Sequence, residues 1–550
     1  MAEPAAHERG QWKSNLGFIL AASGSAIGLG NIVFFSANAY KYGGGAFYLP
    51  YFIALFAIGL PVMILEFGLG HHTGQSFPLA LRRTVGKGGE YLGWFAIINA
   101  TFIAMYYITI LSWVLGMFLG SFGGLWEDSV AVPAFGLAAG DVQNPIAYFF
   151  NMLSSWWVLL LVFVVWLANI YIVRRGARTI ESTVKVFVPL MWLFMLIMLV
   201  RGITLENGVQ GLLLLFTPDF EVMKNLDVWQ GAFSQIFFTL SLGFGIMCAY
   251  SSYLPRRSDQ TNNALMTSFL NCGFEYIAGI AIFTILFATL MIPKASTISM
   301  MFFIIPSGIK HMPVADPMIL VFGVLFFALL LAAGLSSSIS LVEAFSSALI
   351  DKFNANRRRV LVWSFIVGTS GSLLFALPHV IDRGLNADGT LGFTLLDLVD
   401  HWAFSHGLLI VGLIECLLLG WVYGVGRIRR TINEHSKYHL PGAYDWMIKL
   451  VIPALILFVL GFSIYLQVTN PSGLYGSDFA EHYTVDWPWV QALPQIGFWL
   501  WMLTATGGAA LLTLLRSRRE LPLSLRAHHD DAPPAAAVPS PHEEGKEHRS

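Results

Sequence analysis

Two apolar stretches of the chain are interrupted near their middle by glycines and small polar residues. The first, SGSAIGLGNIVFFSANAYKYGGGAF at 23–47, begins as an apolar helix and then reaches Gly28, Gly30 and Asn31. The second, QIFFTLSLGFGIMCAYSSYLP at 235–255, has a similar interruption formed by Thr239, Ser241, Gly243 and Gly245. A helix that unwinds at such a point offers its carbonyls to a hard cation and its amides to an anion.

Glycines in a single apolar helix could be explained by close packing of helices alone. Here two helices carry them beside side-chain oxygens, in corresponding positions if the chain is an internal repeat. Paired interruptions of this kind indicate the central binding site of a membrane transporter. A nucleotide-binding loop at 28–30 is excluded, because the third glycine and the preceding strand of that motif are missing.

Further polar residues recur at helical spacing inside apolar segments. Gln235 and Thr239 are four residues apart, and so are Asn271 and Glu275. The others are a serine group and three acidic residues, namely Ser336, Ser337, Ser338, Ser340, Glu66, Glu343 and Asp400. A lone serine usually bonds to its own helix, whereas an ionisable residue inside a membrane helix is functional by default. These oxygens suit a hard cation, and without a Cys/His cluster a transition metal is disfavoured.

The composition indicates that membrane-spanning helices carry these residues. The 550-residue chain is 56% hydrophobic and 12% charged, with a mean hydropathy of +0.65. A soluble domain would carry about twice that charge. Cys248, Cys272 and Cys416 lie in apolar runs without metal or redox spacing, so we expect buried free thiols.

Apolar runs of about 20 residues predict twelve membrane spans. Their approximate bounds are 15–42, 47–70, 91–120, 155–173, 180–202, 229–254, 262–292, 316–350, 358–378, 392–425, 446–468 and 490–515. Lysine and arginine concentrate in alternate loops, and the positive-inside rule then places both termini in the cytoplasm, with the protein in the inner (plasma) membrane. The segment 516–550 is rich in proline, alanine and charge, which predicts a disordered tail.

Five motifs resemble those of the neurotransmitter:sodium symporters, in particular the bacterial amino-acid transporters close to the leucine transporter. They are GSAIGLGN, YGGGAFYLPYFI, GLPVMILEFGLG, QIFFTLSLGFG and AAGLSSSIS, within a resemblance that covers about residues 9–515. It implies an all-α integral membrane protein of twelve helices, with an inverted 5+5 repeat, broken helices 1 and 6, and two extra C-terminal helices. The implied segments are 1–14 (cytoplasmic), 15–425 (transport core, with repeats 15–202 and 229–425), 446–515 (helices 11 and 12) and 516–550 (tail).

The resemblance also implies alternating access around a midplane site with two Na⁺ ions. The first ion would be held by the substrate carboxylate, the carbonyls of Ala26 and Thr239, and the side chains of Asn31, Thr239 and Asn271. The second would be held by the carbonyls of Gly24, Ile27 and Ala333 and the hydroxyls of Ser336 and Ser337. Relatives often have threonine where Ser336 stands, and serine still supplies the oxygen.

For the substrate, the resemblance implies an α-amino acid. Its carboxylate would meet the amides near Leu29 and Gly30 and the Tyr107 hydroxyl, and its ammonium would meet the carbonyls of Ala26, Phe238, Thr239 and Ser241. The side-chain pocket would be lined by Ile103, Tyr107, Phe238, Ser241, Phe244, Ser337 and Leu341. This uncharged wall favours a neutral amino acid, because a charged side chain would be buried there unpaired. Monoamine transporters of the family have aspartate where this chain has Gly28, which leaves room for a substrate carboxylate.

Glu275 stands where chloride-dependent relatives usually have serine. In those relatives a chloride lies among groups that match Tyr51, Gln235 and Thr239. The Glu275 carboxylate would supply the negative charge itself, so we expect chloride-independent transport, with protonation of Glu275 on the return step as an option. An ordinary buried carboxyl hydrogen-bonded to Gln235 fits the same pattern.

The gates of the family are only partly retained. On the cytoplasmic side Arg9 and Asp351 match the gate pair, with Trp12 and Tyr253 nearby in the pattern. On the outer side Asp400 is kept, but its usual arginine partner is Phe34 here. We expect Phe35 and Tyr107 to form an aromatic lid instead. The family's glycine in the fifth span is replaced by Thr179, which puts the unwinding of that helix in doubt.

These features favour a sodium-coupled symporter of a neutral, hydrophobic amino acid. A sensor of the same fold with weak transport, and a symporter of an amine or another small amino-acid-like molecule, remain alternatives. We do not expect an enzyme, because no nucleophile–base pair, metal cluster or paired-carboxylate arrangement is identifiable. The expected partners are the amino acid and membrane lipid but no nucleic acid, and a homodimer is compatible with the sequence.

Overall fold

Apolar helices form nearly all of the described part of this computed structural model, which comprises residues 11–127, 130–133, 136–218, 220–294, 296–381, 391–469, 475 and 492–517. Within those residues, nine helices are long and apolar enough to cross a membrane, and two bent pairs raise the number to eleven. The one predicted span left over is the sixth, 229–254, which consists of the broken pair α11 (Leu226–Thr239) and α12 (Ile246–Ser251). Eleven spans therefore match the prediction by length and composition, and the total of twelve remains a prediction.

The helices of the first half follow the predicted spans within a few residues. After the first, broken helix, the second span consists of α3 (Tyr48–Ala54), the π-helical turn η3 (Leu55–Gly59) and α4 (Leu60–Thr73). The other spans are α6 (Lys87–Gly120), α8 (Trp157–Val173) and α9 (Ala177–Thr204). Three shorter helices lie outside the predicted spans, α5 (Phe77–Val85), α7 (Asn144–Leu153) and α10 (Gly208–Phe216).

The second half continues after α12 with α13 (Gln260–Ala288) and the short helices α14 (Thr297–Ser299) and α15 (Ile305–Lys310). Two long helices follow, α16 (Asp316–Phe353) and α17 (Arg357–Ile381). The tenth span is α19 (Leu391–Val399), η7 (Asp400–Gly407), α20 (Leu408–Leu417) and η8 (Leu418–Gly424). The chain then forms α21 (Gly426–Asn433), α22 (Ala443–Trp446), η9 (Met447–Val451), α23 (Ile452–Thr469) and α25 (Leu493–Leu514).

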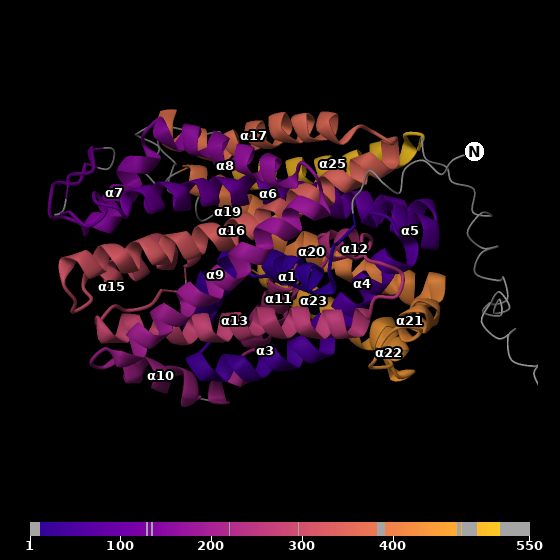
Figure 1. Cartoon of the computed structure of the whole chain (residues 1–550), viewed down its shortest axis with the longest axis horizontal. Helices are drawn as coiled ribbons and strands as arrows, with labels where there is room; N and C mark the ends of the chain where they lie inside the picture. The colour runs from indigo at the N-terminus through magenta and orange to yellow at the C-terminus, as the bar shows by residue number, and fades with distance from the viewer. Residues whose placement is uncertain are drawn as a thin grey trace, which may run out of the picture.

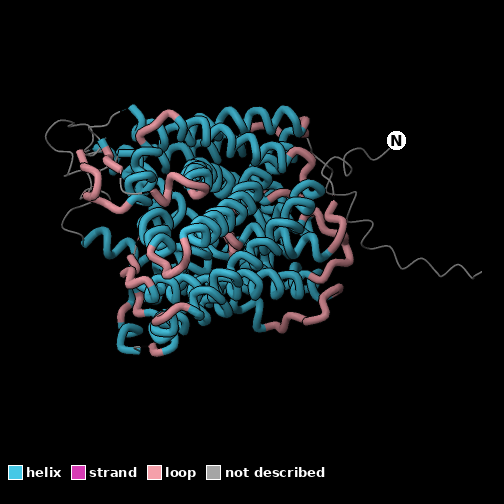
Figure 2. The backbone as a smooth tube through the Cα atoms, turned by 60° about the vertical axis from the view of Figure 1, so that its left-hand side comes forward, coloured by secondary structure: helices cyan, strands magenta, loops and turns pink. Residues whose placement is uncertain are grey.

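The first helix lies inside the bundle. Figure 1 shows α1 near the centre, and α9, α13 and α16 pack directly against it. Nine of the twelve residues of α1 (Asn15–Ala26) are buried. Figure 2 shows the same bundle from another direction, helical throughout and connected by loops. A helix buried on all sides can lose its regular hydrogen bonds only where protein groups replace them, so its break has to be part of a built site.

The first helix breaks where the sequence predicts it. α1 ends at Ala26, and Ile27 adopts an extended conformation with ψ 98°. The helix resumes with the π-helical turn η1 (Gly30–Phe34) and α2 (Phe35–Lys41), and the two halves are bent by 57°. Gly30 fits here because a Cβ would lie 2.0 Å from Cε1 of Phe238. The break therefore brings the main chain of the first span against α11.

The sixth span is interrupted by a longer non-helical segment, 240–245. Gly243 and Gly245 have φ of 76° and 73°, and Ser241 has φ 54°. Glycine takes this left-handed conformation freely, whereas serine rarely does. This strained turn lies beside the break in the first span, since the Ser241 hydroxyl donates a hydrogen bond to the Ser25 carbonyl at 3.4 Å. The two predicted interruptions thus face each other.

The fifth span shows no such opening. α9 runs without interruption from Ala177 to Thr204 and contains Pro189. Thr179 lies in its first turn, where its hydroxyl donates to the Gly176 carbonyl at 3.2 Å and accepts from the Arg175 amide at 3.3 Å. The threonine therefore ties down the start of this helix, which agrees with the doubt raised by the missing glycine.

Candidate functional site

Three buried polar side chains meet at the two breaks, and we call Asn31, Thr239 and Asn271 the amide–hydroxyl cluster. Asn31 Nδ2 donates to Thr239 Oγ1 at 2.9 Å and to Asn271 Oδ1 at 2.7 Å. Asn271 Nδ2 also donates to Thr239 Oγ1, at 2.9 Å. Asn31 Oδ1 accepts from the Gly28 amide at 2.7 Å, which satisfies a donor that the break has freed. The structure thus brings together the side chains expected for the first sodium site.

Glu275 borders this cluster as a fully buried acidic group. Its Oε1 accepts hydrogen bonds from Thr239 Oγ1 at 2.8 Å and Gln235 Nε2 at 2.7 Å, and its Oε2 accepts from the Tyr51 hydroxyl. Asn38 Nδ2 extends the network to Gln235 Oε1 at 3.1 Å. Among the described residues, no lysine or arginine forms an ion pair with Glu275. A buried carboxylate without a basic partner is a natural neighbour for a bound cation.

A second group of oxygens lies between the break of the first span and α16. The Ser336 hydroxyl contacts the Ala333 carbonyl at 2.9 Å and the Ile27 carbonyl at 3.4 Å. The Ser337 hydroxyl contacts the carbonyls of Ser25 at 2.9 Å and Ile27 at 3.4 Å. We call these groups the hydroxyl–carbonyl cluster. Hydroxyls and carbonyls grouped in this way suit a hard cation.

Gly24 also lies at this cluster. A Cβ at its position would be 2.9 Å from Val188 and 3.6 Å from the Ser336 side chain. α1 therefore approaches α9 and α16 too closely for a larger residue. The five residues expected for the second site, Gly24, Ile27, Ala333, Ser336 and Ser337, lie along this one contact between α1 and α16.

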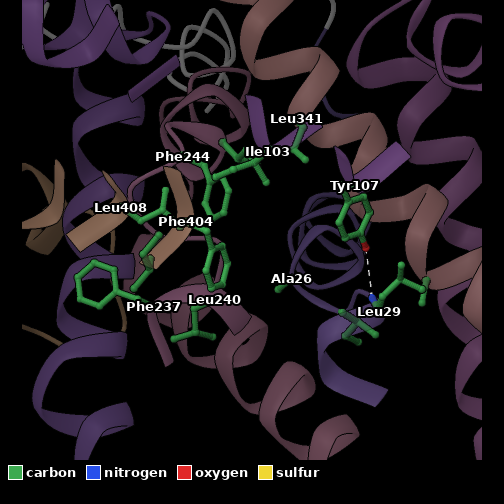
Figure 3. Packing of buried hydrophobic residues seen from close by; sticks show 14 of the residues in the cluster. Ala26, Leu29, Ile103, Tyr107, Phe237, Leu240, Phe244, Leu341, Phe404 and Leu408 are labelled. Atoms are coloured by element: carbon green, nitrogen blue, oxygen red, sulfur yellow. Dashed lines mark hydrogen bonds between the residues drawn. The ribbon is translucent and has the colours of Figure 1, made fainter. Parts of the chain in front are cut away.

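A small internal cavity, with a free volume of about 30 Å³, lies between the two breaks. Most residues predicted for the substrate pocket line it, namely Ala26, Ile103, Tyr107, Phe238, Ser241, Phe244, Ser337 and Leu341. The predicted contacts Leu29, Gly30 and Thr239 are not lining residues, although the Leu29 amide donates to the Tyr107 hydroxyl at 3.2 Å. Figure 3 shows that bond and the ring of Phe244 near Ile103 and Leu341.

The cavity also has lining residues that were not predicted, Ser25, Ile246 and Ser340. Ser340 lies one helical turn from Ser336, so its spacing was a usable signal. Its hydroxyl accepts from Ser25 Oγ at 2.7 Å and donates to the Ser337 carbonyl at 2.6 Å. No charged side chain is among the described residues that line the cavity. An ionised side chain in this space would therefore meet apolar groups, hydroxyls and the Asn31 amide, but no opposite charge among the described residues.

Aromatic rings close one end of the cavity. The ring of Phe238 lies 5.8 Å from that of Phe34 and 4.4 Å from that of Phe404, measured between centroids. Phe34 and Phe404 complete the group at 6.4 Å. The sequence did not point to Phe404, which is in the distant π-helical turn η7. We call these three residues the aromatic gate.

The structure corrects one expectation for this end, that of Phe35, and shows a hydrogen-bond partner for Asp400. Phe35 does not lie over the cavity with Tyr107, because its ring packs against Phe47, Tyr48 and Tyr51 instead. Asp400, whose arginine partner is replaced by Phe34, accepts a hydrogen bond from the Tyr106 hydroxyl at 2.5 Å. Asp400 thus pairs with a phenol in place of an arginine, and Phe34 packs against Phe238, which lines the cavity.

The opposite end is closed around Trp12. Its Nε1 donates to the Tyr250 carbonyl at 2.8 Å, and its ring lies 6.3 Å from that of Tyr253. The Tyr253 hydroxyl donates to Glu343 Oε1 at 2.7 Å, and Arg357 Nη1 donates to the same oxygen at 3.2 Å. The Glu343–Arg357 ion pair joins α16 to α17 and was not foreseen from the sequence.

The predicted inner gate pair can be placed only in part. Asp351 is buried, and its Oδ2 accepts from the Ser76 amide at 2.9 Å. Arg9 lies outside the described residues. The contact between Arg9 and Asp351 therefore stays a prediction.

Two broken helices that meet at an enclosed cavity, flanked by oxygen clusters and closed at both ends, define a membrane transporter of the leucine-transporter fold. The family model described as "Sodium:neurotransmitter symporter family" matches residues 9–131 and 149–505. The chain belongs to this family, which consists of sodium-coupled transporters and not of enzymes.

Individual relatives agree with this assignment. An uncharacterized sodium-dependent transporter of Methanocaldococcus jannaschii is 36% identical over 483 residues, which cover 84% of this chain and 91% of the relative. The sodium- and chloride-dependent GABA transporter 2 of Bos taurus is 27% identical over 479 residues, which cover 80% of this chain and 77% of the relative. The crystal structure of MhsT in complex with L-phenylalanine matches with a TM-score of 0.69 at 29% identity, covering 82% of this chain and 99% of that one.

Proposed function

We propose that this sodium-coupled symporter carries a neutral, hydrophobic α-amino acid. The central cavity supports this most directly, because the described residues that line it include no charged side chain. Beside it, the Leu29 amide and Tyr107 hydroxyl are donors at a helix break, which suits a carboxylate. The structural relative MhsT was crystallised with L-phenylalanine, an amino acid of the proposed class.

A thermal-shift screen of the natural amino acids tests this substrate class. Ligands that bind only the folded state raise its stability, by about 2.7 kcal/mol at a hundred times their Kd. We expect neutral hydrophobic amino acids to raise the melting temperature in Na⁺ and to have little effect in its absence. Stabilisation by an amine or an acidic amino acid, with none by the neutral ones, would refute the proposal.

We assign two sodium sites to this protein. The first consists of the amide–hydroxyl cluster with the Ala26 and Thr239 carbonyls and the substrate carboxylate. The second consists of the carbonyls of Gly24, Ile27 and Ala333 with the hydroxyls of Ser336 and Ser337. The buried Glu275 carboxylate beside the first site provides negative charge next to the cation. Counting the Na⁺ ions bound by the purified protein, by equilibrium dialysis with radioactive sodium, tests the number of sites.

Transport by this protein is proposed to be independent of chloride. The argument is that Glu275 already places a carboxylate among Tyr51, Gln235 and Thr239, so that an added anion would meet a like charge. The bovine relative is named as chloride-dependent, whereas the archaeal one is named only as sodium-dependent. Equal sodium-driven uptake in chloride and gluconate buffers is the expected result, and a large loss in gluconate would contradict it.

Residues 15–425 are proposed to form the transport core, with both termini on the cytoplasmic side of the inner membrane. Sodium-driven accumulation in proteoliposomes separates this symporter from a sensor of the same fold, which would bind the amino acid without accumulating it. Labelling of single cysteines placed in the 121–143 and 426–442 loops tests the orientation. We expect only the first loop to be labelled from outside the cell.

A further inference from the structure

Two buried carboxyl groups lie beside the break in the sixth span and have no part in the substrate or sodium sites. Glu66 belongs to α4 and Glu415 to α20, and both are 0% exposed. Glu66 Oε1 accepts a hydrogen bond from the Gly243 amide at 2.8 Å. The other three carboxyl oxygens, Glu66 Oε2 and both of Glu415, have no hydrogen-bond partner among the described residues. The two groups are close enough to interact electrostatically.

Among the described residues, none supplies a compensating positive charge to this pair. The titratable groups that face it are Cys416 and Tyr444, which are neutral unless they lose a proton. The Tyr444 hydroxyl donates to the Pro61 carbonyl at 3.1 Å and not to either carboxyl group.

Basic residues on the elements packed around the pair interact elsewhere. Arg429 pairs with Asp445 at 2.8 Å, Arg427 lies over Tyr423, Lys449 lies over Trp421, Arg82 pairs with Glu90, and Arg83 donates to the Thr73 carbonyl. The histidines of α4 likewise bond to other groups, His71 to the Pro255 carbonyl and His72 to the Tyr423 hydroxyl. Within the described chain, neither carboxyl group has a basic partner.

Two neighbouring carboxylates cannot both stay ionised in such a place. Burial without a counter-ion strongly disfavours the charged form, and the like charge next to it adds to the penalty. Paired carboxyl groups in proteins respond to this by retaining a proton on one member. Glu66 accepts a backbone N–H, which favours its anion, whereas Glu415 has no donor at all among the described residues. The proton therefore belongs on Glu415.

The pair also contacts the part of the protein that carries the substrate site. Gly243 lies in the left-handed turn between α11 and α12, and a Cβ there would be 3.0 Å from the Leu408 carbonyl of α20. A change in this turn alters the hydrogen bond to Glu66, and with it the charge next to Glu415. By linkage, protonation of the pair shifts the conformational equilibrium of the turn by the same coupling free energy.

We propose that Glu66 and Glu415 form a proton-binding site, separate from the substrate cavity, whose occupancy is coupled to the conformation of the α11–α12 turn. The ligand is a proton from water, which adds to the Glu415 carboxylate to give a neutral carboxylic acid.

Infrared spectroscopy of the purified full-length protein tests the occupancy directly. We expect wild-type protein at neutral pH to show the carbonyl band of a buried carboxylic acid, and Glu415→Gln to lose the intensity of one such group. Glu434→Gln, which changes an exposed glutamate, is the matched control and should leave the spectrum unchanged. A Glu415→Gln spectrum identical to that of the wild type in this region would overturn the proposal. If that variant does not fold, the wild type alone decides, because the absence of any protonated-carboxyl band would overturn it equally.

Hydrogen exchange of the 240–251 backbone tests the coupling. After correction for the intrinsic pH dependence, we expect its exchange rate in wild-type protein to change roughly tenfold as the pair titrates, since a hydrogen bond to a charged acceptor is gained or lost. Glu415→Gln should remove most of this pH dependence, whereas Glu434→Gln, at an exposed position, should retain it. Equal pH dependence in Glu415→Gln and wild type would show that the pair does not act on the turn.

Discussion

The ring of Phe34 meets that of Phe238 edge to face, with centroids 5.8 Å apart, at the end of the central cavity where family resemblance leads one to expect an arginine. Phe238 itself lines the cavity and also contacts Phe404. An apolar contact is insensitive to salt and pH, unlike the ion pair that it replaces. Closure of this end of the cavity therefore depends on ring packing.

Phe34→Ala should weaken the aromatic gate. The substitution removes two edge-to-face contacts, each worth about 0.5–1.5 kcal/mol beyond the area buried. We expect the bound amino acid to dissociate roughly tenfold faster, as measured by release of radiolabelled substrate. Phe163→Ala is the control, because Phe163 pairs with Phe365 at 5.2 Å on a partly exposed face of α8. Equal release from both variants would contradict the assigned role of Phe34.

Asn31→Ala should impair binding of Na⁺. The side chain donates to Thr239 and Asn271 and accepts from Gly28, so its loss removes a proposed cation ligand and disorders the others. The concentration of Na⁺ needed for half-maximal substrate binding should rise at least tenfold, about 1.4 kcal/mol. Asn169→Ala controls for loss of a buried asparagine, since Asn169 donates to the Val165 carbonyl of its own helix. Unchanged sodium dependence in Asn31→Ala would refute the first site as assigned.

Gly28→Asp should abolish binding of an amino acid. A Cβ at this position would lie 2.7 Å from Ser337 Oγ and 2.9 Å from the Tyr107 hydroxyl, and the carboxylate would occupy the region proposed for the substrate's own. Substrate-induced thermal stabilisation should be lost while the protein without ligand keeps its fold. Gly123→Asp, at a site with no atom within 4 Å of the added Cβ, should bind normally. Retained affinity in Gly28→Asp would mean that the carboxylate binds elsewhere.

The position of the site could be predicted from residue types, because glycines and small polar residues in the middle of two apolar spans weaken both helices and suit a binding site. The structure confirms the breaks at Ile27 and at 240–245 and brings Asn31, Thr239 and Asn271 together. These oxygen-bearing residues could be identified from the sequence because each of them lies in a local motif.

The gates could not be predicted in the same way. Whether Phe34 or Phe35 packs against the cavity-lining Phe238 depends on the π-helical turn at Gly30–Phe34, which shifts the helical register after the break. The remaining contacts join residues on different helices that share no local motif, namely those of Phe404, Tyr106 and Arg357. Contacts of this kind follow from tertiary packing, which short-range spacing does not record.

Glu275→Ser should convert the protein to chloride dependence. The substitution removes the buried carboxylate that Tyr51, Gln235 and Thr239 surround, and leaves their donors without an acceptor. We expect sodium-driven uptake by the variant to fall several-fold in gluconate and to recover in chloride, with wild-type uptake equal in both. Glu434→Ser, at an exposed position, should behave like the wild type. A variant that stays insensitive to chloride would show that the anion is not replaced by this carboxylate.

Arg357→Gln should destabilise the contact between α16 and α17. Arg357 donates to Glu343 of α16 and to the Val173 carbonyl at 2.7 Å, and Glu343 is fully buried. Removing one partner of a buried ion pair leaves an uncompensated charge and costs about 3–5 kcal/mol, so the melting temperature should fall clearly. The double variant with Glu343→Gln removes that charge as well and should recover most of the loss, because the two glutamines can hydrogen-bond to each other. If the double variant is no more stable than Arg357→Gln, the arginine stabilises the structure through Val173 alone.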